Sequence, residues 1–206
     1  MNRDPKDLQR YTASERANHW LVGMCFILLS LSGLAFFHPL FWPLTGLFGG
    51  GTWARILHPF IGVVMALSFI AMFLRFRALN VMTPTDREWL SRVKEMVDGS
   101  DQNMPEQGKY NGGQKLVFWG SVTCILLLFV TGIIIWRAYF DFPVNVVRLG
   151  VVVHAIAAAV MISFITVHVY AAIWVKGTIR AMWYGTVTRA WARQHHRAWY
   201  RQVTGK

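Results

Sequence analysis

The segment Leu149–Val175, with the sequence LGVVVHAIAAAVMISFITVHVYAAIWV, decides the fold of this chain. It contains no Asp, Glu, Lys or Arg, and it exceeds the roughly 20 apolar residues that a helix needs to cross the hydrocarbon core of a bilayer. His154 and His168 are its only side chains that ordinarily titrate near neutral pH. The segment therefore predicts a transmembrane helix that carries two histidines at membrane depth.

Three further stretches lack acidic residues, lysine and arginine: Ala17–Ala54, Ile56–Leu74 and Leu116–Trp136. Hydrophobic residues make up 54% of the chain and charged residues 15%, against about 45–50% and about 25% in soluble domains. We therefore predict an all-α integral membrane protein, a four-transmembrane-helix bundle in one membrane domain over residues 1–206. The predicted transmembrane helices cover residues 17–37, 52–77, 114–136 and 146–176.

Positive charge is unevenly distributed between the two ends of these helices. Eighteen of the 21 Lys and Arg residues lie in the N-terminal segment, the loop 78–113, the tail 177–206 and their flanks. The positive-inside rule then places both termini and this loop in the cytoplasm, with the chain as a multi-pass protein of the bacterial inner membrane. Topology and anionic membrane lipid account for the net charge of +11, so we expect no nucleic-acid partner. The first helix reaches Phe37 without a small-residue cleavage site, which predicts a retained helix.

Short helices are expected at the cytoplasmic membrane surface. Thr83 is predicted as an N-cap, with Pro84 and Asp86 at the first and third helical positions. The apolar residues that follow fall on one face, as in an interfacial helix: Trp89, Leu90, Val93 and Val97. The basic and aromatic tail after Gly185 is predicted to form another surface helix.

Four of the seven histidines lie within the predicted transmembrane helices: His19, His58, His154 and His168. A single membrane histidine is as often a buried hydrogen-bonding residue as a ligand. An ionisable group at this depth costs a few kcal/mol, however, so such residues are rare and usually functional. Four of them together indicate a shared function.

The heights of these histidines suggest that function. Separated by 14 residues, His154 and His168 lie about 21 Å apart along one helix and within about 40° of the same face. His58 begins an inward helix at the height of His154, and His19 begins an outward helix at the height of His168. Two imidazoles at one height can fill both axial positions of a haem iron, which suits electron transfer. We therefore predict two b-type haems, held by His58/His154 and His19/His168.

Other residues near these positions have less specific interpretations. Gly23 and Gly62 each lie one helical turn beyond a predicted ligand, where a porphyrin would lie, although glycine is common in membrane helices. His38, His195 and His196 are expected at the surface rather than at a metal. Covalent haem attachment is excluded, since no Cys-x-x-Cys-His motif is present.

Two stacked haems need a redox partner at each end. The chain has no cysteine cluster for iron–sulfur and no nucleotide-binding fingerprint, so catalytic chemistry must belong to another subunit. A quinone is the expected partner at the other end, and the segment Lys109–Lys115 (KYNGGQK) is the candidate site. Asn111 and Gln114 can donate to a quinone carbonyl, and Gly113 permits close approach. An Asn-Gly turn followed by a helix start explains the same residues equally well.

Four motifs spread over nearly the whole chain identify a family: HW at 19–20, RILHPF at 55–60, GKYNGGQK at 108–115 and WVKG at 174–177. In these motifs the chain resembles the cytochrome b (gamma) subunit of respiratory formate dehydrogenase. The GKYNGGQK segment is the most specific of them. Two-haem, four-helix cytochromes as a class also include the hydrogenase subunits.

The resemblance implies a role in anaerobic respiration within a three-subunit complex. A periplasmic molybdenum or tungsten alpha subunit would oxidise formate, and an iron–sulfur beta subunit with its own membrane anchor helix would pass electrons to the outer haem. This chain would then reduce menaquinone or ubiquinone, with Asn111, Gly113 and His168 as quinone contacts. The family also implies a trimer of such heterotrimers.

Other functions predict different observations. A cytochrome b subunit of a nickel–iron hydrogenase would co-purify with a nickel subunit instead of a molybdopterin subunit. A proton transporter with a histidine relay would give preparations without Soret absorbance, as would a scaffold in which the histidines are merely buried.

Overall fold

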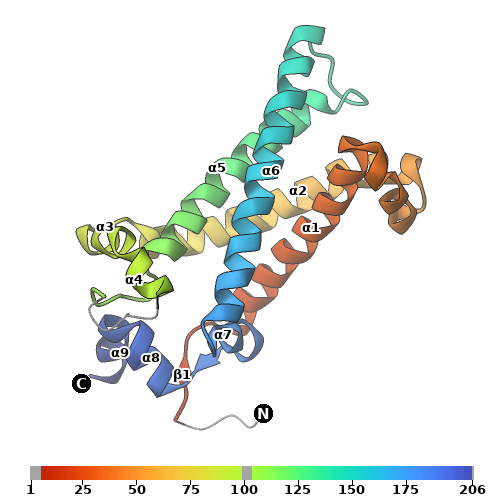
Figure 1. Cartoon of the computed structure of the whole chain (residues 1–206). Coiled ribbons are helices and arrows are strands. Elements are labelled where there is room, and N and C mark those ends of the chain that lie inside the picture. Colours follow the sequence, from red (N-terminus) through yellow and green to blue (C-terminus); the bar gives the residue numbers. More distant parts are fainter. Residues whose placement is uncertain (1–5, 99–103, 206) are drawn as a thin grey trace. The chain divides into compact units, whose positions relative to one another are not determined.

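The computed structural model describes residues 6–98 and 104–205, which are mostly helical (Figure 1). In chain order the elements are β1 (Leu8–Gln9), α1 (Ala13–Phe37), η1 (Pro39–Phe48), α2 (Gly51–Phe76), η2 (Arg77–Asn80), α3 (Pro84–Ser91), α4 (Val93–Val97), α5 (Gly112–Ile135), α6 (Val144–Trp174), α7 (Thr178–Tyr184), β2 (Thr186–Val187), α8 (Arg189–His195) and α9 (Arg197–Thr204). Helices α1, α2, α5 and α6 are long and apolar enough to cross a membrane, which confirms the predicted four-helix membrane fold. Residues 99–103 of the predicted loop lie outside the described residues.

Local capping sets the start of two helices. Helix α1 begins at Ala13, before the predicted residue 17, because Thr12 and Glu15 form a capping box: the Glu15 N–H donates to Thr12 Oγ1 (3.3 Å) and the Thr12 N–H to Glu15 Oε2 (2.7 Å). The predicted N-cap at Thr83 is confirmed, and its side chain accepts from the Asp86 N–H.

The amphipathic pattern predicted through Val97 does not form one continuous helix, because α3 ends at Ser91 and α4 begins two residues later.

The chain forms two compact units. The bundle unit comprises Ala17–Leu74 and Gly120–Thr166, and the terminal unit comprises Met1–Arg16, Arg75–Trp119 and Val167–Lys206. The core of the bundle unit takes side chains from all four long helices: Cys25, Met65, Phe69, Cys124, Ile125 and Met161. Both cysteines are buried free thiols, as expected for small apolar core residues. Many large apolar side chains of these helices are exposed, as membrane helices require.

The terminal unit contains two features that the sequence did not predict. Strand β1 pairs antiparallel with β2, with Leu8 opposite Val187. The tail after Gly185 forms β2, α8 and α9 instead of one surface helix. Gly185, with φ 83°, ends the preceding helix α7, and the Thr188 side chain caps α8. The tail's tryptophans Trp191 and Trp199 are buried in the core of the terminal unit.

Candidate functional site

Two of the four membrane histidines face each other in the bundle unit. His58 lies in the third turn of α2 and His154 in the third turn of α6. Their ring centroids are 6.4 Å apart, with an interplanar angle of 56°. The edge of Phe36 also packs against the His58 ring, at 5.9 Å between centroids. The structure thus brings together the pair that the sequence predicted for one height of the bundle.

Each of these rings is held on one nitrogen by a hydroxyl group. Ser32 Oγ lies 2.7 Å from His58 Nδ1, and Thr131 Oγ1 lies 2.9 Å from His154 Nδ1. Metal-bound histidines usually have this second contact on the nitrogen that does not bind the metal. The Nε2 atoms are therefore the nitrogens that this arrangement leaves for a ligand.

The spacing of the two rings fits a haem iron between them. A metal–imidazole bond is about 2 Å long and the ring centre lies about 1 Å farther on, so two axial rings have centres about 6 Å apart. The observed 6.4 Å agrees with this requirement. A Cβ atom built on Gly62, one turn beyond His58, would meet no heavy atom within 4 Å, so this glycine borders open space. These observations fit a bis-histidine haem with His58 and His154 as its ligands.

The other predicted pair is divided between the two units. His19 lies in the second turn of α1 in the bundle unit, with its ring edge-on to Trp20 at 5.7 Å. His168 lies near the end of α6 in the terminal unit. Their pairing therefore rests on the heights of the two residues along their helices and stays a prediction.

The candidate quinone segment forms the start of α5. Asn111 precedes the helix, and its Oδ1 accepts from the Gln114 N–H (2.9 Å) while Gln114 Oε1 accepts from the Asn111 N–H (3.1 Å). This reciprocal pair is a capping arrangement, which is the structural interpretation of the motif. The side-chain oxygens of Asn111 and Gln114 act as the acceptors in this pair. The side-chain N–H groups of the same two residues do not take part in it and can donate to a carbonyl.

Helix α3 explains the two glycines of this segment. A Cβ on Gly112 would lie 2.6 Å from Asp86 O, and a Cβ on Gly113 would lie 3.0 Å from the Trp89 ring. Packing between α3 and α5 thus requires glycine at position 112 and leaves only a tight fit for a side chain at position 113, whether or not a ligand binds. Because Gly112 and Gly113 begin the helix, their N–H groups have no acceptor within it.

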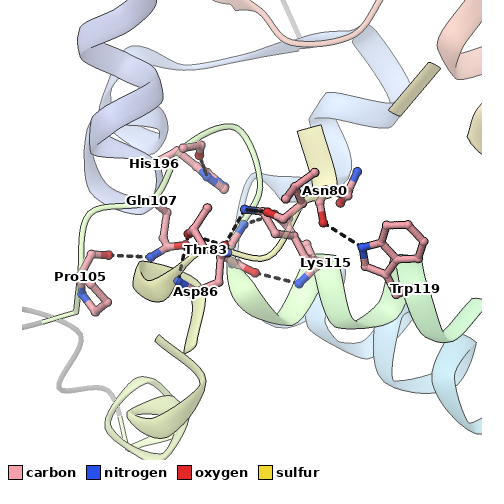
Figure 2. Close-up of polar contacts among 12 residues, drawn as sticks. Asn80, Thr83, Asp86, Pro105, Gln107, Lys115, Trp119 and His196 are labelled. Carbon is pink, nitrogen blue, oxygen red and sulfur yellow. Dashed lines mark hydrogen bonds and ion pairs between the residues drawn. The ribbon is translucent and has the colours of Figure 1, made fainter. Parts of the chain in front are cut away.

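A buried ion pair fixes α5 against α3 (Figure 2). Lys115 Nζ lies 2.6 Å from Asp86 Oδ2 and donates to Val81 O at 3.0 Å. Burial raises the pKa of Asp86, but hydrogen bonds from Lys115 and Thr83 outweigh burial and hold that pKa below its ordinary value. One turn farther along, Trp119 Nε1 donates to Asn80 O. The start of α5 is therefore held at several points outside the candidate segment.

On its other side, the candidate segment is held by the two ends of the chain. Three successive backbone carbonyls accept from distant groups: Gln107 O from the Trp199 N–H (3.4 Å), Gly108 O from His196 Nδ1 (2.7 Å) and Lys109 O from Arg10 Nη2. Arg10 is only 4% exposed and lies over four aromatic rings: Tyr11, Tyr110, Trp191 and Trp199. The segment therefore has a defined conformation before any ligand binds.

His196 is a buried member of this cluster, at 1% exposure, so the prediction that it lies at the surface is wrong. Gly108 O can only accept and Arg10 can only donate, so His196 is neutral, with its proton on Nδ1. His195 packs against Trp191, while His38 is exposed at the N-cap of η1, as predicted.

A pH dependence follows from this burial. Burial first, and then the charge of Arg10, lowers the pKa of His196 from 6.5 to about 3. The unfolded chain binds a proton at this residue near pH 6.5, so the stabilisation is complete above that pH. It decreases as the pH falls towards the folded-state value, by up to about 1.4 kcal/mol per pH unit. We expect hydrogen-exchange protection of α9 amides to fall between about pH 6.5 and 5.

The control is His196→Asn, which keeps a donor for Gly108 O but does not titrate in this range. Its α9 protection should depend much less on pH. An equally steep dependence in both proteins would show that another group is responsible.

Sequence reasoning missed the two hydroxyl residues and the buried cluster. Ser32 and Thr131 each precede a glycine near the end of a membrane helix, at the height expected for His58 and His154. This repeated dipeptide was the available signal. The cluster around Arg10 had no such signal, because its members come from three distant parts of the chain.

Comparison with known proteins connects this geometry to a family. Residues 10–185 match the prokaryotic cytochrome b561 family, and all four membrane histidines and Asn111 fall within that range. The chain is 48% identical over 196 residues to the formate dehydrogenase cytochrome b556(fdo) subunit of Escherichia coli strain K12, covering 94% of this chain and 92% of that protein.

Two other relatives are similar over comparable lengths. The nitrate-inducible formate dehydrogenase cytochrome b556(Fdn) subunit of the same strain is 44% identical over 191 residues, covering 92% of this chain and 88% of that protein. The formate dehydrogenase cytochrome b556 subunit of Haemophilus influenzae strain Rd is 39% identical over 195 residues, covering 94% and 82%. Both alignments cover most of each protein.

Proposed function

Because the chain belongs to the prokaryotic cytochrome b561 family, we propose that it is the cytochrome b subunit of a formate dehydrogenase. The relatives described above carry that name, and membership of a cytochrome b family implies haem b as the cofactor. The facing rings of His58 and His154, at the spacing that one iron requires, are the observation that carries the proposal. When bound, the haem supplies one-electron oxidation and reduction.

The proposal includes a second haem, between His19 and His168. It is supported by the sequence separation of His154 and His168, which puts two ligands on one face of α6 at heights about 21 Å apart. The residues that would hold the two groups at fixed heights are His58 and His154 for one and His19 and His168 for the other. The haems would supply electron transfer without binding oxygen or substrate.

The proposed acceptor is a quinone, menaquinone or ubiquinone, bound at the start of α5. Support comes from amide N–H groups of Asn111 and Gln114 that the capping contacts do not use, and from the Gly113 N–H at the start of the helix. These donors suit a carbonyl oxygen that gains negative charge on reduction. His168, near the end of α6, is proposed as a further quinone contact and is also the proposed haem ligand.

The proposed complex contains two other kinds of subunit. An iron–sulfur beta subunit with a membrane anchor helix would deliver electrons, and a molybdenum or tungsten alpha subunit would oxidise formate; the assembly would be a trimer of heterotrimers. The four apolar helices place the chain in a membrane. We propose the bacterial inner membrane, with both termini in the cytoplasm, from the distribution of Lys and Arg.

Charge movement across the membrane tests this function. Electrons that enter from the periplasm and reduce quinone at the cytoplasmic side move inward against a membrane potential. The opposing work is about 2.3 kcal/mol per electron at 100 mV, or about 4.6 kcal/mol for two electrons. Formate oxidation by sealed vesicles of known orientation should therefore generate a potential, negative on the cytoplasmic side, that can be followed with a voltage-sensitive dye.

An uncoupler should collapse that potential while formate oxidation continues, and a quinone-site inhibitor should prevent it. Quinone reduction at full rate with no potential would place the quinone site on the periplasmic side. The topology and the assignment of the Lys109–Lys115 segment would then both be wrong.

A further inference from the structure

Ser32 and Thr131 contact the two facing histidines in the same way. We propose that they are positioning residues that fix the tautomers of His58 and His154 and lower the reduction potential of the haem between those rings. The proposal rests on the haem site proposed above for this pair. Both hydroxyl residues are almost fully buried, at 0% and 6% exposure, among the described residues of the bundle unit.

The direction of each hydrogen bond follows from the other partners of the hydroxyl. Ser32 Oγ lies 2.8 Å from Leu28 O, and Thr131 Oγ1 lies 2.6 Å from Leu127 O. A carbonyl oxygen can only accept, so each hydroxyl gives its single proton to its own helix. Towards the imidazole, each hydroxyl oxygen can then only accept.

This assignment fixes the protonation of both rings. If the hydroxyl oxygens accept, then the Nδ1 atoms of His58 and His154 must carry the protons. A neutral imidazole has only one N–H group, so each Nε2 keeps a lone pair. Both rings are thereby prepared as ligands before a metal binds, and their orientation is set by a contact from a neighbouring helix.

The glycine after each hydroxyl residue contributes to the same arrangement. A Cβ atom on Gly33 would lie 3.7 Å from His58 Cε1, and a Cβ on Gly132 would lie 3.7 Å from His154 Cε1. The dipeptides Ser32-Gly33 in α1 and Thr131-Gly132 in α5 thus approach their rings through equivalent contacts. Two equivalent contacts on the two ligands of one site favour a shared function over incidental helix packing.

A hydrogen bond from Nδ1 changes the electronic properties of the ligand. Donation of this proton to an oxygen makes the imidazole more electron-rich and more basic towards a metal. A hydroxyl that donates its own proton elsewhere is a stronger acceptor, so the chain of hydrogen bonds is cooperative. An electron-rich ligand stabilises ferric iron more than ferrous iron, and the reduction potential of the site falls.

The test uses the intact complex with Ser32→Ala and Thr131→Val, the second of which keeps the side-chain volume. Spectroscopic redox titration should show a higher midpoint potential for the His58–His154 haem in each variant. We expect the ferrous-to-ferric ratio at a fixed potential to change about three- to tenfold, which is about 30–59 mV for one electron. The other haem should keep its potential, and Thr131→Ser, which retains the hydroxyl, should restore the original value.

Ser163→Ala and Thr166→Val are matched controls on α6. Their hydroxyls donate to Ala159 O (3.0 Å) and Ile162 O (2.8 Å) of the same helix, and both residues are exposed. The midpoint potentials of both haems should be unchanged in these two variants.

An unchanged midpoint potential in Thr131→Val, with the haem still bound, would overturn the proposal. The Thr131 hydroxyl would then have no role beyond its hydrogen bond to the carbonyl of its own helix. If Ser32→Ala loses the haem, the volume-conserving Thr131→Val still decides. Failure of the haem site itself would look different, because His58→Ala and His154→Ala would then retain both haems.

Discussion

Replacement of His154 by alanine is expected to remove one haem and leave the other fully bound. The Nε2 atom of His154 is one of two proposed axial ligands, and its partner His58 lies on the other side of the same space, at 6.4 Å between ring centroids. Without this imidazole, His58 alone would hold the haem, which should then be bound too weakly to be retained. Haem per chain should therefore fall from two to one, as measured by the reduced pyridine haemochrome spectrum. His38→Ala, which changes an exposed histidine in η1, is the control and should retain both haems.

The same series tests which ligands belong together. His58→Ala should remove the same haem as His154→Ala, and His19→Ala the same haem as His168→Ala, as identified by midpoint potential. If His19→Ala and His154→Ala removed the same haem, the assignment of ligands by height along the helices would be wrong.

A cap-preserving substitution, Asn111→Asp, is expected to slow quinone reduction while leaving the protein folded with both haems. Asp keeps the side-chain oxygen that accepts from the Gln114 N–H, but it cannot donate to a quinone carbonyl. A hydrogen bond to a developing charge contributes about 1.5–3 kcal/mol, so the rate should fall about tenfold to a hundredfold. Formate-dependent haem reduction should continue, and the defect should appear in quinone turnover and inhibitor affinity.

Asn111→Leu separates the two roles of this residue. It removes both the cap and the donor, so the helix start should lose about 0.5–2 kcal/mol in addition to the quinone defect. Normal quinone turnover in Asn111→Asp, with a defect only in Asn111→Leu, would make the residue a helix cap with no direct part in quinone binding.

The membrane architecture could be predicted because it depends on local sequence. Four uncharged stretches of sufficient length leave helices as the available structure in a bilayer. The cap at Thr83 was predictable for the same reason, since Thr83 and Asp86 are only three residues apart. The approach of His58 to His154 could also be predicted. Each residue lies near the start of a helix that is predicted to run inward across the membrane, so the two are expected at the same height.

Contacts between distant segments were not predictable in this way. Arg10, Gly108 and His196 meet in one buried cluster, although nothing near any of them in the sequence indicates the others. From the sequence, Arg10 was interpreted as part of the cytoplasmic positive charge, and His196 was expected at the surface. Burial became possible only because four aromatic rings and backbone carbonyls surround these polar groups.

The hydroxyl partners of the facing histidines are an intermediate case. Serine and threonine in a membrane helix ordinarily donate to a carbonyl one turn earlier, as Ser163 and Thr166 do. The hydroxyl group alone therefore does not distinguish Ser32 and Thr131 from these residues, and the glycine that follows each of them is the only local difference. Only the packing of α1 against α2, and of α5 against α6, brings a second polar group to the hydroxyl oxygen.

Haem content per chain tests the central claim most directly. In the purified complex, the pyridine haemochrome spectrum and protein quantification should give two haems b for each copy of this chain. Ferric-state electron paramagnetic resonance should then show two low-spin, bis-imidazole centres. A preparation without Soret absorbance, or with a single haem that survives both His58→Ala and His154→Ala, would contradict the account.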